Sequence, residues 1–153
     1  MRELDLSAPW PGKLGEGLAV IPEGAAVQLS GRIESVHEGI LVSGEASTVA
    51  LAECSRCLTD FELDVQVDFT ELFAYSLTED FDYGVDDDHV DLEPVVRDAV
   101  VLALPFQPVC RPDCAGLNPE SGEKLAPGQE WEPESSIDPR WAALEGFRKH
   151  DDA

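Results

Sequence analysis

Positive charge is scarce in this sequence. Its 153 residues include 10 Lys and Arg against 32 Asp and Glu, which gives a formal net charge of −22. A surface of that sign repels phosphate, so we expect no broad binding of nucleic acid. It steers instead toward cationic partners such as basic proteins, polyamines and metal ions. The other interpretation, that the acidity only keeps the protein soluble, stays open.

Long apolar segments are also missing. The longest apolar run, residues 99–106, is far shorter than the roughly 20 residues that a membrane helix needs. Residues 1–17 contain no positively charged stretch followed by an apolar one, so they predict no secretory signal. We therefore expect a cytoplasmic protein without a membrane span. In that reducing compartment, cysteines are more often thiols or metal ligands than structural disulfides.

The signature motifs of common enzymes are absent as well. The chain contains no Walker loop, no GxGxxG and no HExxH, and its three histidines, His37, His89 and His150, lie far apart in sequence. No serine, cysteine or carboxylate is spaced from them as a catalytic triad requires. The sequence therefore predicts a protein that is not an enzyme and has no small-molecule substrate.

The length leaves room for one domain, since domains typically contain about 100–200 residues. We expect this domain over residues 1–147, with Trp10, Trp131 and Trp141 available to its core, and a tail over 148–153. Four parts follow along the chain. They are a β-rich part over 1–75, an acidic loop over 76–90, a helix with a second cysteine pair over 91–114, and an irregular segment over 115–147 that ends in a short helix.

The clearest periodicity lies in residues 61–70, where apolar side chains alternate with polar ones. The apolar set is Phe61, Leu63, Val65, Val67 and Phe69. A period of two residues is typical of a strand with one dry face, which favours an antiparallel sheet. A turn around residues 37–39 adds a hairpin signal. We expect a curved antiparallel sheet that is either open or closed into a partial barrel.

The segment after the sheet begins with strong acidity. Residues 79–93 contain eight acidic side chains and no basic one, which predicts an extended, solvated loop. The main helix is expected over 91–104, with Asp91 as its cap and Pro94 in its first turn. Its predicted apolar face comprises Leu92, Val95, Val96, Ala99, Leu102 and Ala103. The fold class is thus α+β.

Four cysteines form two closely spaced pairs. Cys54 and Cys57 are three residues apart, and Cys110 and Cys114 are four apart, so each turn can present two sulfurs to one ion. Four thiolates complete a tetrahedral structural zinc site that has no open position for catalysis. The long separation between the pairs makes such a site a clasp between the sheet and the irregular C-terminal segment.

Two other interpretations of the cysteines stay open. A redox CxxC needs its first cysteine at a helix N-terminus, whereas Cys57 leads into the alternating strand. Unligated thiols or a disulfide form the other alternative. Arg56 and Arg111 lie in or beside the pairs, where they either offset the negative charge of a zinc–thiolate centre or form a small basic patch that contacts RNA phosphate.

These motifs occur in an order that resembles a known family. A Cys-x-x-Cys-Leu precedes the alternating strand and the acidic spacer. The segment V-D-L-x-P-x-V-R-D-A-V-V-L-A-L-P-F-Q-P-V-C follows, and then C-x-x-x-C-x-G-L and D-P-R-W-A-A-L. From about Cys54 to Phe147, the chain resembles the YceD family of large ribosomal RNA subunit accumulation proteins. Many members carry a further cysteine pair, which would align with Asn118 and Ser121 here.

The resemblance implies a non-enzymatic cytoplasmic factor for accumulation of large-subunit (23S) ribosomal RNA and for assembly of the large subunit. Combined with the acidity, it suggests that the protein holds a basic ribosomal protein. A second mechanism is binding of precursor rRNA through Arg56 and Arg111. An alternative of another class is an acidic interaction module that masks the nucleic-acid-binding surface of a regulator.

Overall fold

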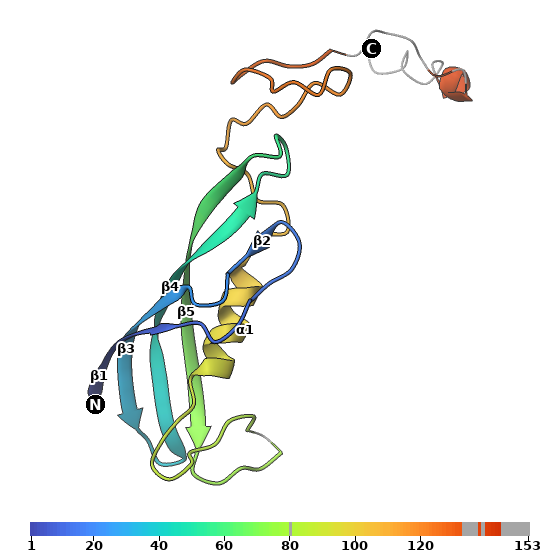
Figure 1. Ribbon diagram of the computed structural model, residues 1–153. Coiled ribbons are helices and arrows are strands. Elements are labelled where there is room, and N and C mark those ends of the chain that lie inside the picture. Colours follow the sequence, from blue (N-terminus) through green and yellow to red (C-terminus); the bar gives the residue numbers. More distant parts are fainter. Residues whose placement is uncertain (80, 133–137, 139, 145–153) are drawn as a thin grey trace.

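The computed structural model describes residues 1–79, 81–132, 138 and 140–144. Figure 1 shows a sheet of five strands with one long helix against it. The elements are β1 (Arg2–Pro9), β2 (Ala19–Val20), β3 (Ala26–Ser35), β4 (Gly39–Glu53), β5 (Asp60–Ala74) and α1 (Glu93–Ala103). The prediction of an antiparallel sheet with one main helix is confirmed.

The sheet is open and centred on β4. On one side β4 pairs with β3, which pairs in turn with β1, and on the other side β4 pairs with β5 along its whole length. The short β2 continues the β3 side of β4, where it pairs with Leu51 and Ala52. Strands β1 and β5 lie at opposite edges and do not pair, so the described residues form no closed or partial barrel.

Two glycines allow β3 and β4 to cross closely. Gly31 lies opposite Gly44 in the pairing. A Cβ atom at Gly31 would lie 2.3 Å from the carbonyl oxygen of Ser43, and one at Gly44 would lie 2.5 Å from that of Ser30. Any side chain would push the strands apart here, which is a typical reason for glycine inside a strand.

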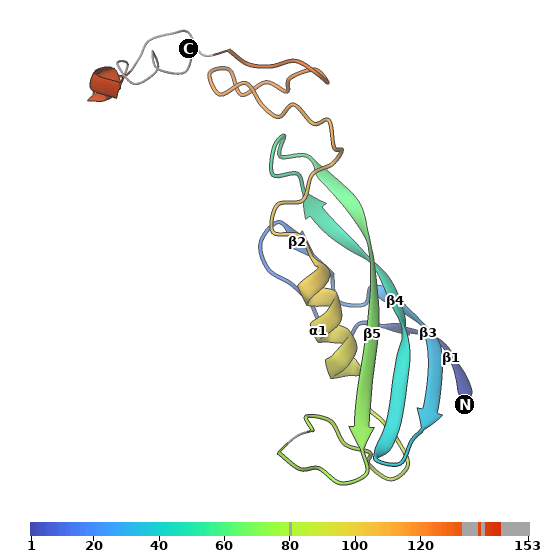
Figure 2. The same ribbon diagram turned by 180° about the vertical axis from the view of Figure 1, so that it is seen from behind.

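The core lies between the sheet and α1. Val65, Phe69 and Phe73 of β5 are buried, whereas Asp64 and Asp68 are exposed, so the predicted dry face of this strand is confirmed. Figures 1 and 2 show α1 against a single face of the sheet, and its main contacts are to β5. Trp10 is buried, but Trp131 and Trp141 are exposed, so only one of the three tryptophans anchors the core.

The buried face of α1 differs from the predicted one at its C-terminal end. Val95, Val96 and Val100 are buried, whereas Leu102 is 85% exposed. Leu102 follows the buried Val95 by seven residues, so at about 100° per residue the two side chains leave the helix within roughly 20° of each other. Leu102 is therefore exposed by its place in the last turn of the helix and not by its direction. At the other end the N-cap residue is Leu92 and not the predicted Asp91. The Asp91 carboxylate, one residue before the N-cap, accepts a hydrogen bond from the N–H of Glu93 at 3.0 Å.

The acidic segment before α1 is less solvated than predicted. Tyr83, Val85 and Val90 pack against the core, and the Tyr83 ring lies 5.7 Å from that of Phe73, centre to centre. The exposed turn Asp87–Asp88 has positive φ angles, which Asp tolerates better than most residues. Burial of a few apolar side chains therefore holds the segment to the core despite its charge.

The chain after α1 passes the far end of the β4–β5 hairpin, as Figure 2 shows. Described residues 104–132 form turns and one isolated bridge, between Leu117 and Lys124. Residues 140–144 form a short 3₁₀ turn, while the rest of the predicted closing helix and the tail 148–153 lie outside the described residues. The described part of the chain contains no helix long and apolar enough to cross a membrane.

Candidate metal centre

The two cysteine pairs come from distant parts of the chain and meet at the end of the β4–β5 hairpin. Cys54 follows the last residue of β4, and Cys57 lies three residues before β5 begins. Cys110 and Cys114 lie in the segment that follows α1. The N–H of Ser55 donates to the carbonyl of Pro108 at 2.8 Å and joins the two segments. All four predicted ligands are therefore in one place.

The sulfur positions fit a tetrahedral metal ion. The Sγ atoms of Cys54 and Cys114 are 3.8 Å apart, those of Cys57 and Cys110 are 3.7 Å apart, and all four lie within 4.8 Å of one another. Four sulfurs at the usual zinc–sulfur distance of about 2.3 Å would be separated by about 3.8 Å. A disulfide requires about 2.05 Å, and none of the four cysteines forms one.

Backbone hydrogen bonds shape the first cysteine turn. The N–H of Leu58 donates to the carbonyl of Cys54, and the N–H of Cys54 donates to the carbonyl of Thr59, both at 2.9 Å. Leu58 takes a φ of 56°, in the left-handed region that favours glycine. This tight turn brings both sulfurs of the first pair to the same side.

The local environment lowers the pKa of two of the four thiols and raises the pKa of the other two. Burial acts to raise the pKa of Cys54, but backbone N–H groups of Cys110, Cys57 and Arg56 donate to its sulfur and bring the pKa down to about 6. A hydrogen bond with the Thr59 hydroxyl lowers the pKa of Cys57. Burial and the neighbouring sulfur of Cys57 raise the pKa of Cys110 to about 12. Four thiolates at these separations would repel one another, and a bound cation would offset that repulsion.

Apolar side chains surround the centre. Cys54, Cys57 and Cys114 are buried and Cys110 is half-buried, with Phe61, Val109 and Leu117 packed against them. This cluster is separate from the main core. These side chains cover three of the four cysteines, while Cys110 stays partly exposed, and no side-chain ligand other than the four thiols joins the group among the described residues.

The two arginines take different partners. Arg56 Nη1 donates to the carbonyl oxygen of Cys114 at 3.0 Å and to that of Pro112 at 3.5 Å, so it links the first cysteine turn to the second. Arg111 forms an exposed ion pair with Asp113 at 3.5 Å. Arg56 therefore contacts the backbone of the centre, whereas Arg111 points to a neighbouring carboxylate.

Sequence reasoning missed two residues beside the sulfurs. Thr59 Oγ1 lies 3.1 Å from the sulfur of Cys57, and Lys124 Nζ donates to the same oxygen at 2.6 Å. The hydroxyl can thus donate to a Cys57 thiolate while it accepts from the ammonium group, which brings positive charge close to the sulfur. The sequence could have pointed to Thr59, because this residue lies two positions after Cys57, but no local pattern points to Lys124.

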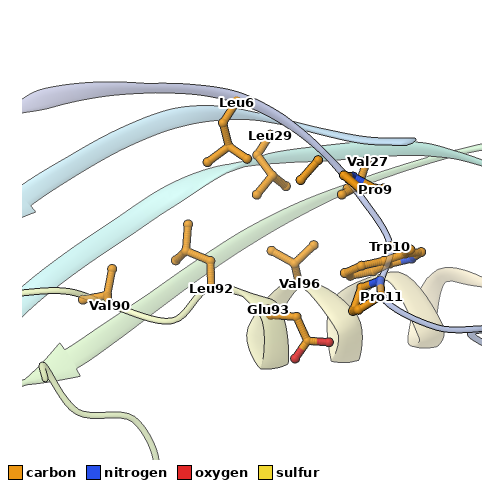
Figure 3. A pocket seen from close by; sticks show the side chains of 11 residues that line it. Leu6, Pro9, Trp10, Pro11, Val27, Leu29, Val90, Leu92, Glu93 and Val96 are labelled. Carbon is orange, nitrogen blue, oxygen red and sulfur yellow. The ribbon is translucent and has the colours of Figure 1, made fainter. Parts of the chain in front are cut away.

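A partly open apolar pocket lies elsewhere. It has a volume of about 270 Å³ between β1, β3 and the start of α1, and Figure 3 shows its lining. Its walls include Leu6, Trp10, Leu29, Leu92 and Val96, and Glu93 is its one charged lining residue. The Trp10 Nε1 atom is buried without a hydrogen-bond partner among the described residues. The lining contains no nucleophile and no group of metal ligands, so the cysteine centre remains the candidate site.

Comparison with known proteins places this architecture in a family. A model described as "Large ribosomal RNA subunit accumulation protein YceD" matches residues 42–148, which include all four cysteines and α1. This match begins within β4, earlier than the resemblance seen from the sequence. No solved structure matches the chain.

Relatives of this chain include proteins of Mycobacterium and Bacillus. The chain is 46% identical over 153 aligned positions to an uncharacterized protein of Mycobacterium tuberculosis (strain ATCC 25618 / H37Rv), with 94% of this chain and 72% of the relative covered. It is 30% identical over 131 positions to the uncharacterized protein YlbN of Bacillus subtilis (strain 168), with 82% and 76% covered. With the family model matching well over half of its length, the chain belongs to the YceD family of large ribosomal RNA subunit accumulation proteins.

Proposed function

We propose that this protein is a non-enzymatic cytoplasmic factor that supports accumulation of large-subunit (23S) ribosomal RNA and assembly of the large subunit. The observation that carries the proposal is the family match, which spans the cysteine centre and the core helix. The cysteine centre suits a structural role, because four thiolates leave no position for water or substrate on a metal ion.

Zinc is the metal that we propose for the centre. Four thiolate ligands with near-tetrahedral sulfur spacing suit zinc, and an iron–sulfur cluster would need more room between the sulfurs. Held by Cys54, Cys57, Cys110 and Cys114, the ion would tie the end of the β4–β5 hairpin to the segment after α1. Arg56 would support this clasp through the carbonyls of the second turn.

A basic ribosomal protein fits the surface better than rRNA does. Each ion pair among the described residues joins an arginine to a carboxylate two or four residues away in the sequence. These arginines are Arg32, Arg97, Arg111 and Arg140. Most of the described carboxylates therefore have no cationic partner. Arg56 and Arg111, the candidate phosphate contacts, already bind carbonyl and carboxylate oxygens. We therefore favour a mechanism in which the protein holds a basic ribosomal protein until the rRNA receives it.

Depletion of the protein in its own host tests the function. We expect the ratio of large- to small-subunit rRNA to fall and large-subunit precursors to change in length, because the rRNA lacks its protein partner. Gel or sequencing analysis of total RNA measures both. An unchanged ratio with normal ribosome profiles contradicts the proposal and favours the masking of a regulator's nucleic-acid-binding surface.

Thr59→Val tests the support of the metal centre. The substitution keeps the side-chain shape but removes the hydroxyl that contacts Cys57 and Lys124. Loss of such an outer contact typically weakens metal binding about 10–100-fold. Competition with a chromogenic zinc chelator measures the change. Thr70→Val, on the exposed side of β5, is the matched control, and equal affinities for the two variants would contradict the role of Thr59.

A further inference from the structure

The face of the β4–β5 hairpin that α1 does not cover is strongly acidic. Figures 1 and 2 show the helix on the other side of the sheet. The strand register places six carboxylates on this outer face. Glu45 lies opposite Asp68, and Glu53 lies opposite Asp60. Glu62 lies opposite Leu51, and Asp64 lies opposite Val49. None of these six carboxylates forms an ion pair among the described residues.

A groove lies beside β2, where β4 ends and β5 begins. It has a volume of about 550 Å³, and its apolar lining includes Leu18, Val20, Leu51 and Phe61. Leu51, a large aliphatic residue near the end of β4, is 48% exposed. Three carboxylates, those of Glu53, Asp60 and Glu62, line the same groove, and no lysine or arginine does.

A groove lined by both apolar side chains and carboxylates suits one kind of occupant. Lysine and arginine side chains have aliphatic stems that pack on apolar surface and cationic ends that pair with carboxylates. Nucleic acid would be repelled by the same carboxylates. Val49 and Leu51 are exposed among these charges, so they offer apolar surface that such stems can cover.

The spacing of the carboxylates suits an extended polypeptide. Side chains at every second residue of a strand lie on one face and repeat about every 7 Å. Asp60, Glu62 and Asp64 follow this repeat on β5. An extended segment with a cation at every second residue has the same repeat, so successive cations can meet successive carboxylates.

We infer that the groove formed by Leu18, Val20, Leu51, Glu53, Asp60 and Glu62 is the docking site for an extended Lys- or Arg-rich segment of a basic protein. This inference rests on the proposed function, and it adds the surface and the chemistry of the partner. The backbone of the groove does not depend on its charges, since the N–H of Glu53 donates to the carbonyl of Leu18 at 2.8 Å. Removal of the charges should therefore leave the fold intact.

Binding of a synthetic peptide of alternating Arg and Val, measured by fluorescence anisotropy, tests the inference. The groove variant is Glu53→Gln/Asp60→Asn/Glu62→Gln in the full chain. The matched control is Asp86→Asn/Asp87→Asn/Asp88→Asn, which removes the same charge from three exposed residues of another loop. We expect the groove variant to bind at least about tenfold more weakly, or about 1.4 kcal/mol, and the control to change less than about twofold.

Further outcomes separate specific docking from general attraction. Leu51→Ser should weaken binding about threefold without any change in charge, because the arginine stems lose their apolar contact. A peptide with Gln in place of Arg should not bind. Equal losses in the two triple variants would show attraction to net charge alone and would overturn the inference, as would full binding by the groove variant.

The same variants separate this inference from the proposed function. If the groove variant restores large-subunit rRNA in depleted cells as well as the unchanged protein does, the docking site is wrong while the function stands. If depletion leaves the rRNA ratio unchanged, the function is wrong, and the peptide measurements still decide whether the groove binds basic segments.

Discussion

Removal of zinc from the cysteine centre is expected to expose all four thiols and to unfold the segments that carry them. Structural zinc contributes roughly 10–16 kcal/mol of apparent binding free energy in small peptides. The centre has its own small apolar cluster, separate from the main core, so the loss should be local. We expect amide exchange at residues 54–59 and 108–117 to accelerate at least about 1,000-fold, while β3 and most of β4 stay protected.

This prediction is checked with a chelator under reducing conditions, by metal analysis, thiol titration and hydrogen exchange. One zinc per chain and four thiols that react only after chelation are expected. Cys54→Ser should reproduce the chelated state, whereas Ser55→Ala keeps all four sulfurs and should retain the metal. A protein purified without metal whose exchange pattern is unaffected by added zinc would contradict the clasp.

Phe73→Ala is expected to destabilise the whole domain by roughly 3–5 kcal/mol. The Phe73 side chain is 1% exposed and lies between the sheet, α1 and Tyr83 of the acidic segment. Truncation leaves a cavity that these elements cannot fill without moving. For a chain of this size, a loss of that size lowers the melting temperature by roughly 10 °C.

Thermal and urea unfolding of the metal-loaded protein measure this effect. Phe106→Ala is the matched control, since it makes the same chemical change at a side chain that is 98% exposed. A surface substitution of this kind usually stays within about 0.5 kcal/mol of the parent protein. Equal destabilisation by the two variants would mean that the core does not lie where the structure places it.

Local sequence patterns predicted the character of the individual elements. The alternation in residues 61–70 identified both the strand and its dry face, because only an extended chain places every second side chain on one side. The short spacing within each cysteine pair predicted that both sulfurs of a pair would face one point. The excess of acidic residues predicted the sign of the surface, since composition alone sets it.

The tertiary structure decided everything that depends on how distant segments meet. It brought Cys114 within 3.8 Å of Cys54, gave Arg56 its carbonyl partners and placed Lys124 beside Thr59. It also left the sheet open, placed Leu102 outside the core at the end of α1, and gathered unpaired carboxylates around a partly apolar groove. These features follow from the strand register and from how the helix crosses the sheet. Contacts between distant segments set both, whereas hydrophobic periodicity is a local property of the chain.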